Sequence, residues 1–275
     1  MAKHPCVIVH SSTVVQEPLP DLQRGDHHTD SSAIHPVKFV GTLQPWTTFA
    51  ADALAAFQNH DWGRHKAQLE LRPTTSPSVP SLLREHVLVG QEGGVQGRWM
   101  EHVGQDMTAI LKDQLIPLRF GDFKASATAY AKQPDVACMG LNGPAELIGE
   151  LKVPWVDTHS LTDAVTTDDK LRQVLGQIAE YMLDLGLAYA FMSTYEDTIF
   201  LRQVQAAGTW SLQYSEPIPH MNGGPQAVSV RMGMWLLVDE VQQGRSRANN
   251  LLRKTQWVKE TRKGTFYPTS LGGTG

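Results

Sequence analysis

A short apolar run that contains two charges most constrains how this chain can fold. The run Leu147–Val153 (LIGELKV) has the length and composition of a β-strand. Side chains alternate along a strand, so Glu150 and Lys152 are expected on one face, about 6–7 Å apart along the backbone. Charges within an apolar strand are costly unless they are paired or bind a metal ion. The run therefore predicts either a polar site on a buried sheet or an edge strand with a solvated Glu/Lys face.

A second carboxylate precedes this run at a separation that suits a hairpin. Residues 134–139 and 145–153 are predicted strands, and the Asn142-Gly143 pair between them is a strong turn signal. Asp135 begins the first strand and Glu150 lies in the second, so the hairpin can bring the two carboxylates side by side. Paired carboxylates commonly hold Mg²⁺, which prefers oxygen ligands, and a neighbouring ammonium can orient water and stabilise charge on a phosphate.

A predicted helix after the hairpin supplies two further candidates. Residues 166–169 provide N-cap side chains, and Gly186 stands where a C-cap is expected. Gln177 and Tyr181 are four residues apart, so they are neighbours at the border of the apolar stripe of this helix. An amide and a phenol there could hold a phosphate, a water or the carboxylates. The alternative is an ordinary boundary glutamine beside a half-buried tyrosine.

The other segments complete the pattern of a mixed α/β domain. Further helices are expected at 45–60, 99–115 and 227–243, with a break at 93–97, and further strands at 123–131, 188–194, 198–204 and 210–214. Residues 1–43 are rich in Ser, Thr, Pro, Asp and His, which predicts a poorly ordered N-terminal arm. We expect a single domain with an N-terminal helical extension over 44–243, followed by a basic C-terminal segment over 244–275.

Charge and cysteine content limit the classes of partner and compartment. The net charge is −4, yet residues 242–275 carry seven Lys or Arg and one Glu, so they sum to +6 and the rest of the chain to −10. This segment is expected either to contact phosphates or to form a solvated helix and frayed terminus. Two cysteines make no disulfide framework, and no apolar stretch is long enough for a bilayer. These features favour an intracellular protein, nuclear or cytoplasmic, without a membrane partner.

Together the motifs resemble those of the PD-(D/E)XK nuclease superfamily. They are Gln133-Pro134-Asp135, Gly149-Glu150-Leu151-Lys152 and Gln177-Ile178-Ala179-Glu180-Tyr181. The Gln-xxx-Tyr element resembles the RecB-like branch of that superfamily. Two further stretches, 171–177 and 193–202, resemble uncharacterised nuclease-like domains abundant in fungal genomes. The resemblance covers roughly residues 95–205.

The resemblance implies a fold, a cofactor and a role for each motif residue. The implied fold is α/β, a restriction-endonuclease-like core whose central mixed sheet is flanked by helices in the order αβββαββ. Asp135, Glu150 and the backbone carbonyl of Leu151 would hold Mg²⁺ or Mn²⁺, and Lys152 would position the attacking water. Many relatives add an acid from the helix before the first strand. Here Glu101 points away from the apolar stripe of its helix and Asp106 lies nearer its border, so neither is assigned to the site.

The function expected from these motifs is that of a metal-dependent nuclease that hydrolyses phosphodiester bonds. DNA is the first candidate substrate and RNA the second, and both exonuclease and endonuclease activity remain open. Asp135, Glu150, Lys152, Gln177 and Tyr181 are the expected catalytic residues. A catalytically inactive module of the same fold, which binds nucleic acid or protein, is the alternative. A homo-oligomer is compatible with the sequence.

Overall fold

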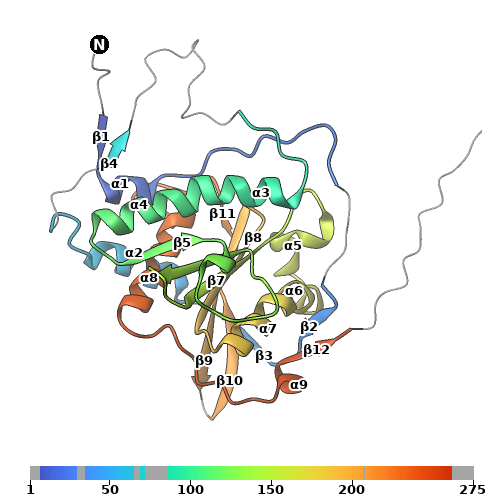
Figure 1. Ribbon diagram of the computed structural model, residues 1–275. Coiled ribbons are helices and arrows are strands. Elements are labelled where there is room, and N and C mark those ends of the chain that lie inside the picture. Colours follow the sequence, from blue (N-terminus) through green and yellow to red (C-terminus); the bar gives the residue numbers. More distant parts are fainter. Residues whose placement is uncertain (1–6, 30–34, 65–68, 72–85, 207, 262–275) are drawn as a thin grey trace, which may run out of the picture.

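The computed structural model describes residues 7–29, 35–64, 69–71, 86–206 and 208–261, and these build an α/β fold around a large mixed sheet (Figure 1). The eight-stranded sheet has the order β3-β10-β9-β8-β7-β6-β5, and β11 pairs with β9 outside this path. Its strands are β3 (Thr42–Pro45), β5 (Leu118–Gly121), β6 (Val136–Gly140), β7 (Ala145–Leu151), β8 (Tyr189–Ser193), β9 (Asp197–Ala206), β10 (Thr209–Tyr214) and β11 (Ile218–Pro219). The pairs β7–β8 and β3–β10 are parallel, and the other pairs are antiparallel.

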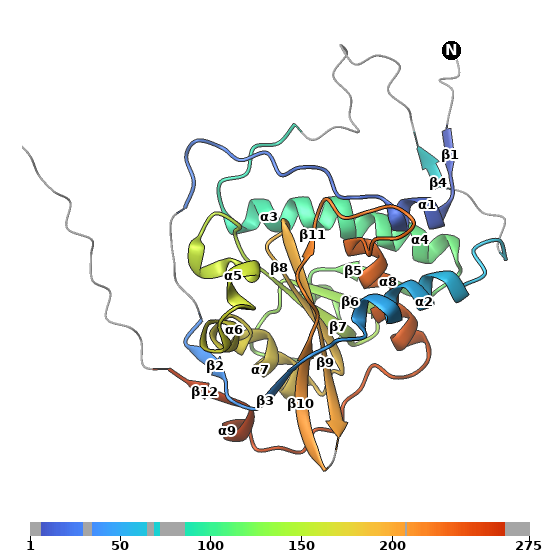
Figure 2. The ribbon, with the colours of Figure 1, turned by 180° about the vertical axis from the view of Figure 1, so that it is seen from behind.

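Helices cover both faces of this sheet, as the two opposite views show (Figures 1 and 2). On one face, α3 (Glu92–Trp99), the π-helix η1 (Met100–Gln105) and α4 (Asp106–Asp113) follow one another directly and share a core with α1 (Ser11–Gln16), α2 (Phe49–Asn59) and α8 (Val230–Gln242). The other face carries α5 (Leu161–Ala164), α6 (Asp168–Val174), α7 (Gly176–Leu185) and α9 (Lys254–Trp257). The sheet is therefore a middle layer with a separate apolar core on each side.

Two small two-stranded sheets lie outside the main sheet. β1 (Val7–Val9) pairs with β4 (Leu69–Leu71), and β2 (Val37–Phe39) pairs antiparallel with β12 (Val258–Glu260). β2 also packs on α6 and α7. The approach to α7 is close: a Cβ on Gly176 would lie 1.9 Å from the carbonyl oxygen of Val37, so only glycine fits there. This contact fixes residues 35–39 beside the helix that carries Gln177.

The predicted hairpin is confirmed, and the helix expected after it is confirmed in part. β6 and β7 pair antiparallel with Val136 opposite Gly149, and Asn142 takes a left-handed φ of 58° in the turn between them. Gly186 ends α7 with a φ of 62°, as a C-cap glycine does. The expected single helix over this region is interrupted at Leu175, which separates α6 from α7.

Two expectations about the preceding segment are wrong. The strand expected at 123–131 is not formed; β5 lies earlier, and Phe123–Ala125 is a short 3-10 helix, η2. In β5, Leu118 and Phe120 are buried on either side of exposed Arg119, the alternation a half-buried strand needs, whereas the small residues after Phe123 lack it. The break expected at 93–97 also fails, because α3 runs through these glycines and buries Val95 and Trp99.

The N-terminal segment differs from the poorly ordered arm expected over 1–43. Within it, β1, α1 and β2 are formed, while residues 1–6 and 30–34 lie outside the described part. The basic C-terminal segment contains α9 and β12, and residues 262–275, with Arg262 and Lys263, are likewise outside. No helix among the described ranges combines the length and apolar character needed to cross a bilayer.

Candidate active site

The hairpin brings the two predicted carboxylates to one face of the sheet. Because Val136 pairs with Gly149, Asp135 stands across from Glu150, and directly opposed residues of a hairpin point to the same side. This is the side covered by α6 and α7, where Ala137 and Ile148 are buried. Glu150 is only 3% exposed and Asp135 is partly buried. The sequence thus predicted the pairing of these acids correctly.

Lys152 lies beside this carboxylate pair, as the two-residue spacing predicts. Its Nζ donates a hydrogen bond to Oε1 of Glu150 at 2.7 Å. Burial lowers the pKa of Lys152, but the carboxylates of Glu150, Glu92 and Asp135 have a larger opposite effect, so the lysine pKa is raised. The side chain is therefore a held ammonium that donates hydrogen bonds and cannot accept a proton.

Burial disfavours the charged forms of the Glu150 and Asp135 carboxyl groups. Burial and the neighbouring Asp135 raise the pKa of Glu150 to about 8, and Lys152 only partly offsets them. Burial also raises the pKa of Asp135, against the hydrogen bond from the Leu151 amide and the Lys152 charge. Glu150 faces two acids, Asp135 and Glu92, and one cation, Lys152. Lys152 faces the same two acids and Glu150, so this cluster has three carboxyl groups for one ammonium.

The main chain of Leu151 reaches the site through its amide. The Leu151 N–H donates to Oδ2 of Asp135 at 2.7 Å, which fixes this carboxylate against β7. Gln96 of α3 donates to the backbone carbonyl of Asp135 at 2.9 Å and holds the same residue from the other side of the sheet. The Leu151 carbonyl as a metal ligand stays a prediction.

Gln177 and Tyr181 lie at this face of the sheet but bind each other. The Gln177 amide donates to the Tyr181 hydroxyl at 2.7 Å, as their spacing on α7 allows. Burial raises the pKa of Tyr181 to about 12; the Gln177 hydrogen bond lowers it, and the Glu150 charge adds to the rise. The structure therefore brings all five predicted residues to one region, with Tyr181 as a neutral phenol.

Glu92 is a site residue that the sequence prediction missed. It occupies the first turn of α3, and its Oε2 lies 3.6 Å from Nζ of Lys152. The two acids considered in the sequence lie further along, on η1 and α4, and are engaged elsewhere, Glu101 with Arg98 and Asp106 with Arg231. Glu92 was missed because the helix was expected to begin only at Trp99. Its position just before Gly93-Gly94 was the available signal, since acids favour the first turn of a helix.

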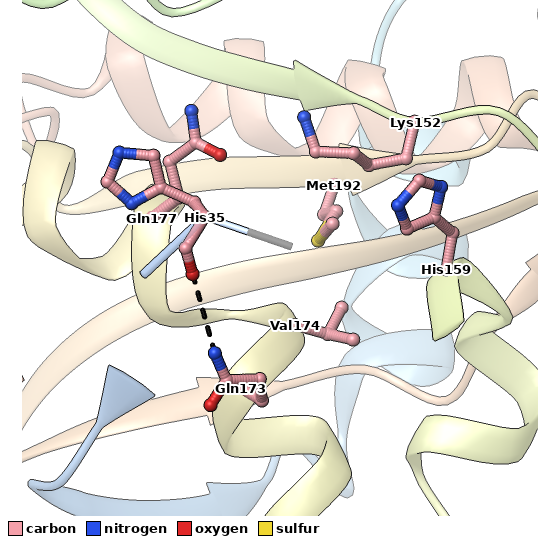
Figure 3. Close-up of a pocket in the computed structure, with 7 residues that line it drawn as sticks. All are labelled: His35, Lys152, His159, Gln173, Val174, Gln177 and Met192. Atoms are coloured by element: carbon pink, nitrogen blue, oxygen red, sulfur yellow. Dashed lines mark hydrogen bonds between the residues drawn. The ribbon is translucent and has the colours of Figure 1, made fainter. Parts of the chain in front are cut away.

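A small pocket adjoins Lys152 at the carboxyl ends of the parallel strands β7 and β8 (Figure 3). It has room for about one water molecule. Its lining consists of His35, Lys152, His159, Gln173, Val174, Gln177 and Met192. In Figure 3, His35 and Gln177 lie on one side of the hollow and His159 on the other. Neither histidine is among the five expected catalytic residues.

The carboxylates fit a divalent cation in part. Oε2 of Glu150 is buried and has no hydrogen-bond partner among the residues described, so an acceptor beside Asp135 is left over. Two carboxylates with surplus negative charge are a donor set suited to Mg²⁺, which keeps several of its waters. Within the same described ranges, no group of three or more His, Cys, Asp or Glu side chains is arranged to hold a metal ion. The fit therefore rests on two carboxylates.

Several basic residues of the C-terminal segment are in ion pairs with the body of the protein. Lys254 lies 2.8 Å from Glu180 and 2.7 Å from Asp184, and Arg247 lies 3.1 Å from Glu146. Arg245 pairs with Glu240. These ion pairs neutralise part of the positive charge of the C-terminal segment, so less of it is available to contact phosphates.

Comparison with known proteins gave no relative. No family model matches the chain, and neither a curated protein nor a solved structure matches it.

Proposed function

We propose that this chain is a Mg²⁺- or Mn²⁺-dependent nuclease that hydrolyses phosphodiester bonds of DNA, with RNA as the second candidate, on a restriction-endonuclease-like core. One observation carries the proposal: Asp135 and Glu150 face each other on neighbouring strands with the Lys152 ammonium against them. The element order supports it. The helix α3–α4, strands β5, β6 and β7, the helix pair α6–α7 and strands β8 and β9 follow the order αβββαββ.

Each residue of the site has a role in this proposal. Asp135 and Glu150, with the Leu151 carbonyl, would hold the cation, which supplies Lewis-acid stabilisation of charge that develops on the phosphate. Lys152 donates hydrogen bonds to the attacking water and to the phosphate oxygens. Gln177 and Tyr181 hold the polar wall beside Lys152.

A cleavage assay tests the proposal. The full chain is incubated with linear, nicked and single-stranded DNA, and with RNA, in Mg²⁺ or Mn²⁺. We expect cleavage by the wild type and a loss of about 10²–10³-fold in Lys152→Ala, the usual cost of removing one charge-stabilising donor. Lys112→Ala, at an exposed position on α4, is the matched control and should cleave normally. Equal cleavage by Lys152→Ala would contradict the proposal.

Metal titration by calorimetry separates a nuclease from an inactive module of the same fold. A nuclease should show a Mg²⁺- or Mn²⁺-binding heat that Asp135→Ala abolishes. An inactive binding module should show no such site while it still binds nucleic acid or protein.

A further inference from the structure

The main sheet ends at β5 beside an open groove that the proposed nuclease site does not use. β5 is the last strand in the order of the sheet, and the groove lies against it and against the turn that connects it to α4. The groove has a volume of about 520 Å³. Its lining consists of Thr108, Lys112, Leu115, Ile116, Pro117, Leu118 and Arg119.

Leu115 occupies a position that does not suit a leucine. It follows Gln114, the C-cap of α4, and the Ile116 amide donates to the Leu111 carbonyl at 2.8 Å, which is the Schellman pattern of a helix end. Leu115 has the left-handed φ of 55° that this pattern requires and that glycine usually supplies. The residue is also 70% exposed. Neither the end of the helix nor core packing therefore accounts for a leucine here.

A second exposed leucine lies at the same end of the β5–β6 pair. Leu118 pairs with Gly140, and Leu141, the next residue, is 68% exposed. Single exposed apolar residues are ordinary on a protein surface. Two at one strand end, beside a groove lined by Ile116 and Pro117, are typical of a surface that contacts another protein.

The edge of β5 does not favour the addition of a strand from a partner. The Leu118 amide donates to the Ile116 carbonyl at 2.8 Å, and the Phe120 amide donates to the Thr108 hydroxyl at 3.0 Å. A strand added at this edge would need such donors for its own main-chain hydrogen bonds. A partner in the groove is therefore held by side chains.

Two cations line the same groove as the apolar side chains. Lys112 and Arg119 are exposed, and neither forms an ion pair in the part of the chain that the structure describes. The segments outside that part together contain more Lys and Arg than Asp and Glu, so they do not complement this charge. A second copy placed symmetrically on the groove would set the same cations against each other. The charge thus favours an acidic partner that is a different protein.

We propose that this groove docks an acidic peptide segment of a partner protein, whose apolar side chain covers Leu115 and whose carboxylates pair with Lys112 and Arg119. The phosphates of a nucleic acid would match the two cations, but they would gain nothing from an exposed leucine in a left-handed conformation. This docking does not depend on the proposed nuclease function.

Selection from a library of displayed random peptides tests the chemistry of the ligand. The full chain is the target, and binding of the selected peptides is measured by fluorescence polarisation. We expect peptides that combine Asp or Glu with Leu or Phe, and that bind at least roughly tenfold more weakly to Leu115→Gly and to Arg119→Glu. Lys124→Glu and Leu251→Gly, at exposed positions outside the groove lining, are the matched controls and should bind like the wild type.

The thermal midpoint of Leu115→Gly should equal or exceed that of the wild type, because glycine fits the left-handed position after the C-cap. A lower midpoint would show that the leucine serves the fold, and it would overturn the proposal. So would a selection that yields no peptide, or only neutral or basic ones, or peptides that bind Leu115→Gly as well as the wild type. Duplex DNA whose binding depends on Leu115 and Arg119, or a dimer in sedimentation that Leu115→Gly dissociates, would assign the groove to another occupant and overturn it as well.

Discussion

At the scale of single residues, Glu150 is the buried acid on which the proposed metal site chiefly depends. It is buried, it faces a second carboxylate, and one of its oxygens lacks a partner among the residues described. A buried acid in such a position favours its protonated form. The folded chain without a cation therefore binds this proton more tightly than the unfolded chain does, and stability becomes linked to pH.

This linkage predicts how stability changes with pH. The pKa of Glu150 is about 8 in the fold against an ordinary 4.5, so its stabilising contribution is complete below pH 4.5 and is lost as pH rises toward 8. In EDTA, the free energy of unfolding should fall by roughly a few kcal/mol between pH 5 and 8, at about 1.4 kcal/mol per pKa unit. Urea unfolding at a series of pH values measures this fall, and added Mg²⁺ should reverse it.

Two variants show whether Glu150 is the cause. Glu150→Gln should abolish most of the fall. Glu146→Gln, on the same strand but paired with Arg247 instead, should keep it. A wild type whose stability in EDTA is flat over this range would argue against the buried carboxylate pair.

The residues that sequence alone identified are those tied to strand and helix periodicity. Asp135, Glu150 and Lys152 share a face because strand alternation and hairpin pairing require it, and Gln177 meets Tyr181 because helical spacing requires it. Glu92 was missed because the start of its helix was misplaced. His35 was missed because its position depends on the close approach of β2 to α7, which no local pattern in the sequence encodes.

At the scale of elements, the contact between α7 and β2 determines where the wall of the pocket lies. Gly176→Ala would place a methyl group 1.9 Å from the Val37 carbonyl oxygen, so β2 must shift. We expect a loss of about 1–3 kcal/mol in the free energy of unfolding, as for other overpacked contacts. Chemical denaturation measures it. Gly97→Ala in α3 meets nothing within 4 Å and should instead stabilise the protein by about 0.5–1 kcal/mol.

An equal effect of the two substitutions would mean that β2 is not seated on α7. In that case the wall of the pocket that β2 forms would also lose its fixed position, so the same pair of variants checks that wall.

Element prediction from sequence succeeded where local signals agreed and failed where tertiary contacts decided. The β6–β7 hairpin has alternating strands and a turn pair, and it formed as expected. Helix α3 contains three glycines, so its propensity is low, yet burial of Val95 and Trp99 on the sheet makes it helical. The expected strand over 123–131 consists of small residues whose composition resembled a strand but offered no apolar face.

At the scale of the whole molecule, Arg231 joins three parts of the chain. Its side chain is 5% exposed; it donates from Nε to the His102 carbonyl at 2.9 Å and from Nη1 to the Glu17 carbonyl at 3.2 Å. Nη2 donates to Asp106 at 2.6 Å. One guanidinium from α8 thus ties the N-terminal segment and the π-helix to the core.

Arg231→Ala should therefore destabilise the protein strongly. We expect a loss of about 3–5 kcal/mol in the free energy of unfolding, since breaking a buried pair leaves Asp106 without its cation. Arg231→Lys should recover only part, because an ammonium cannot reproduce the fork of donors. Arg119→Ala, at an exposed position on β5, is the control and should stay within about 0.5 kcal/mol of the wild type. A mild effect of Arg231→Ala would show that these three parts are held independently.

The pairing of β2 with β12 also matters for the newly made chain. The carboxylate hairpin can form from neighbouring residues soon after it leaves the ribosome, but β2 lacks its partner strand until residues 258–260 have been translated. Contacts between such distant segments form slowly. The wall that β2 forms beside the pocket is then among the last parts to settle, so the site is complete only after residues 258–260 have been translated.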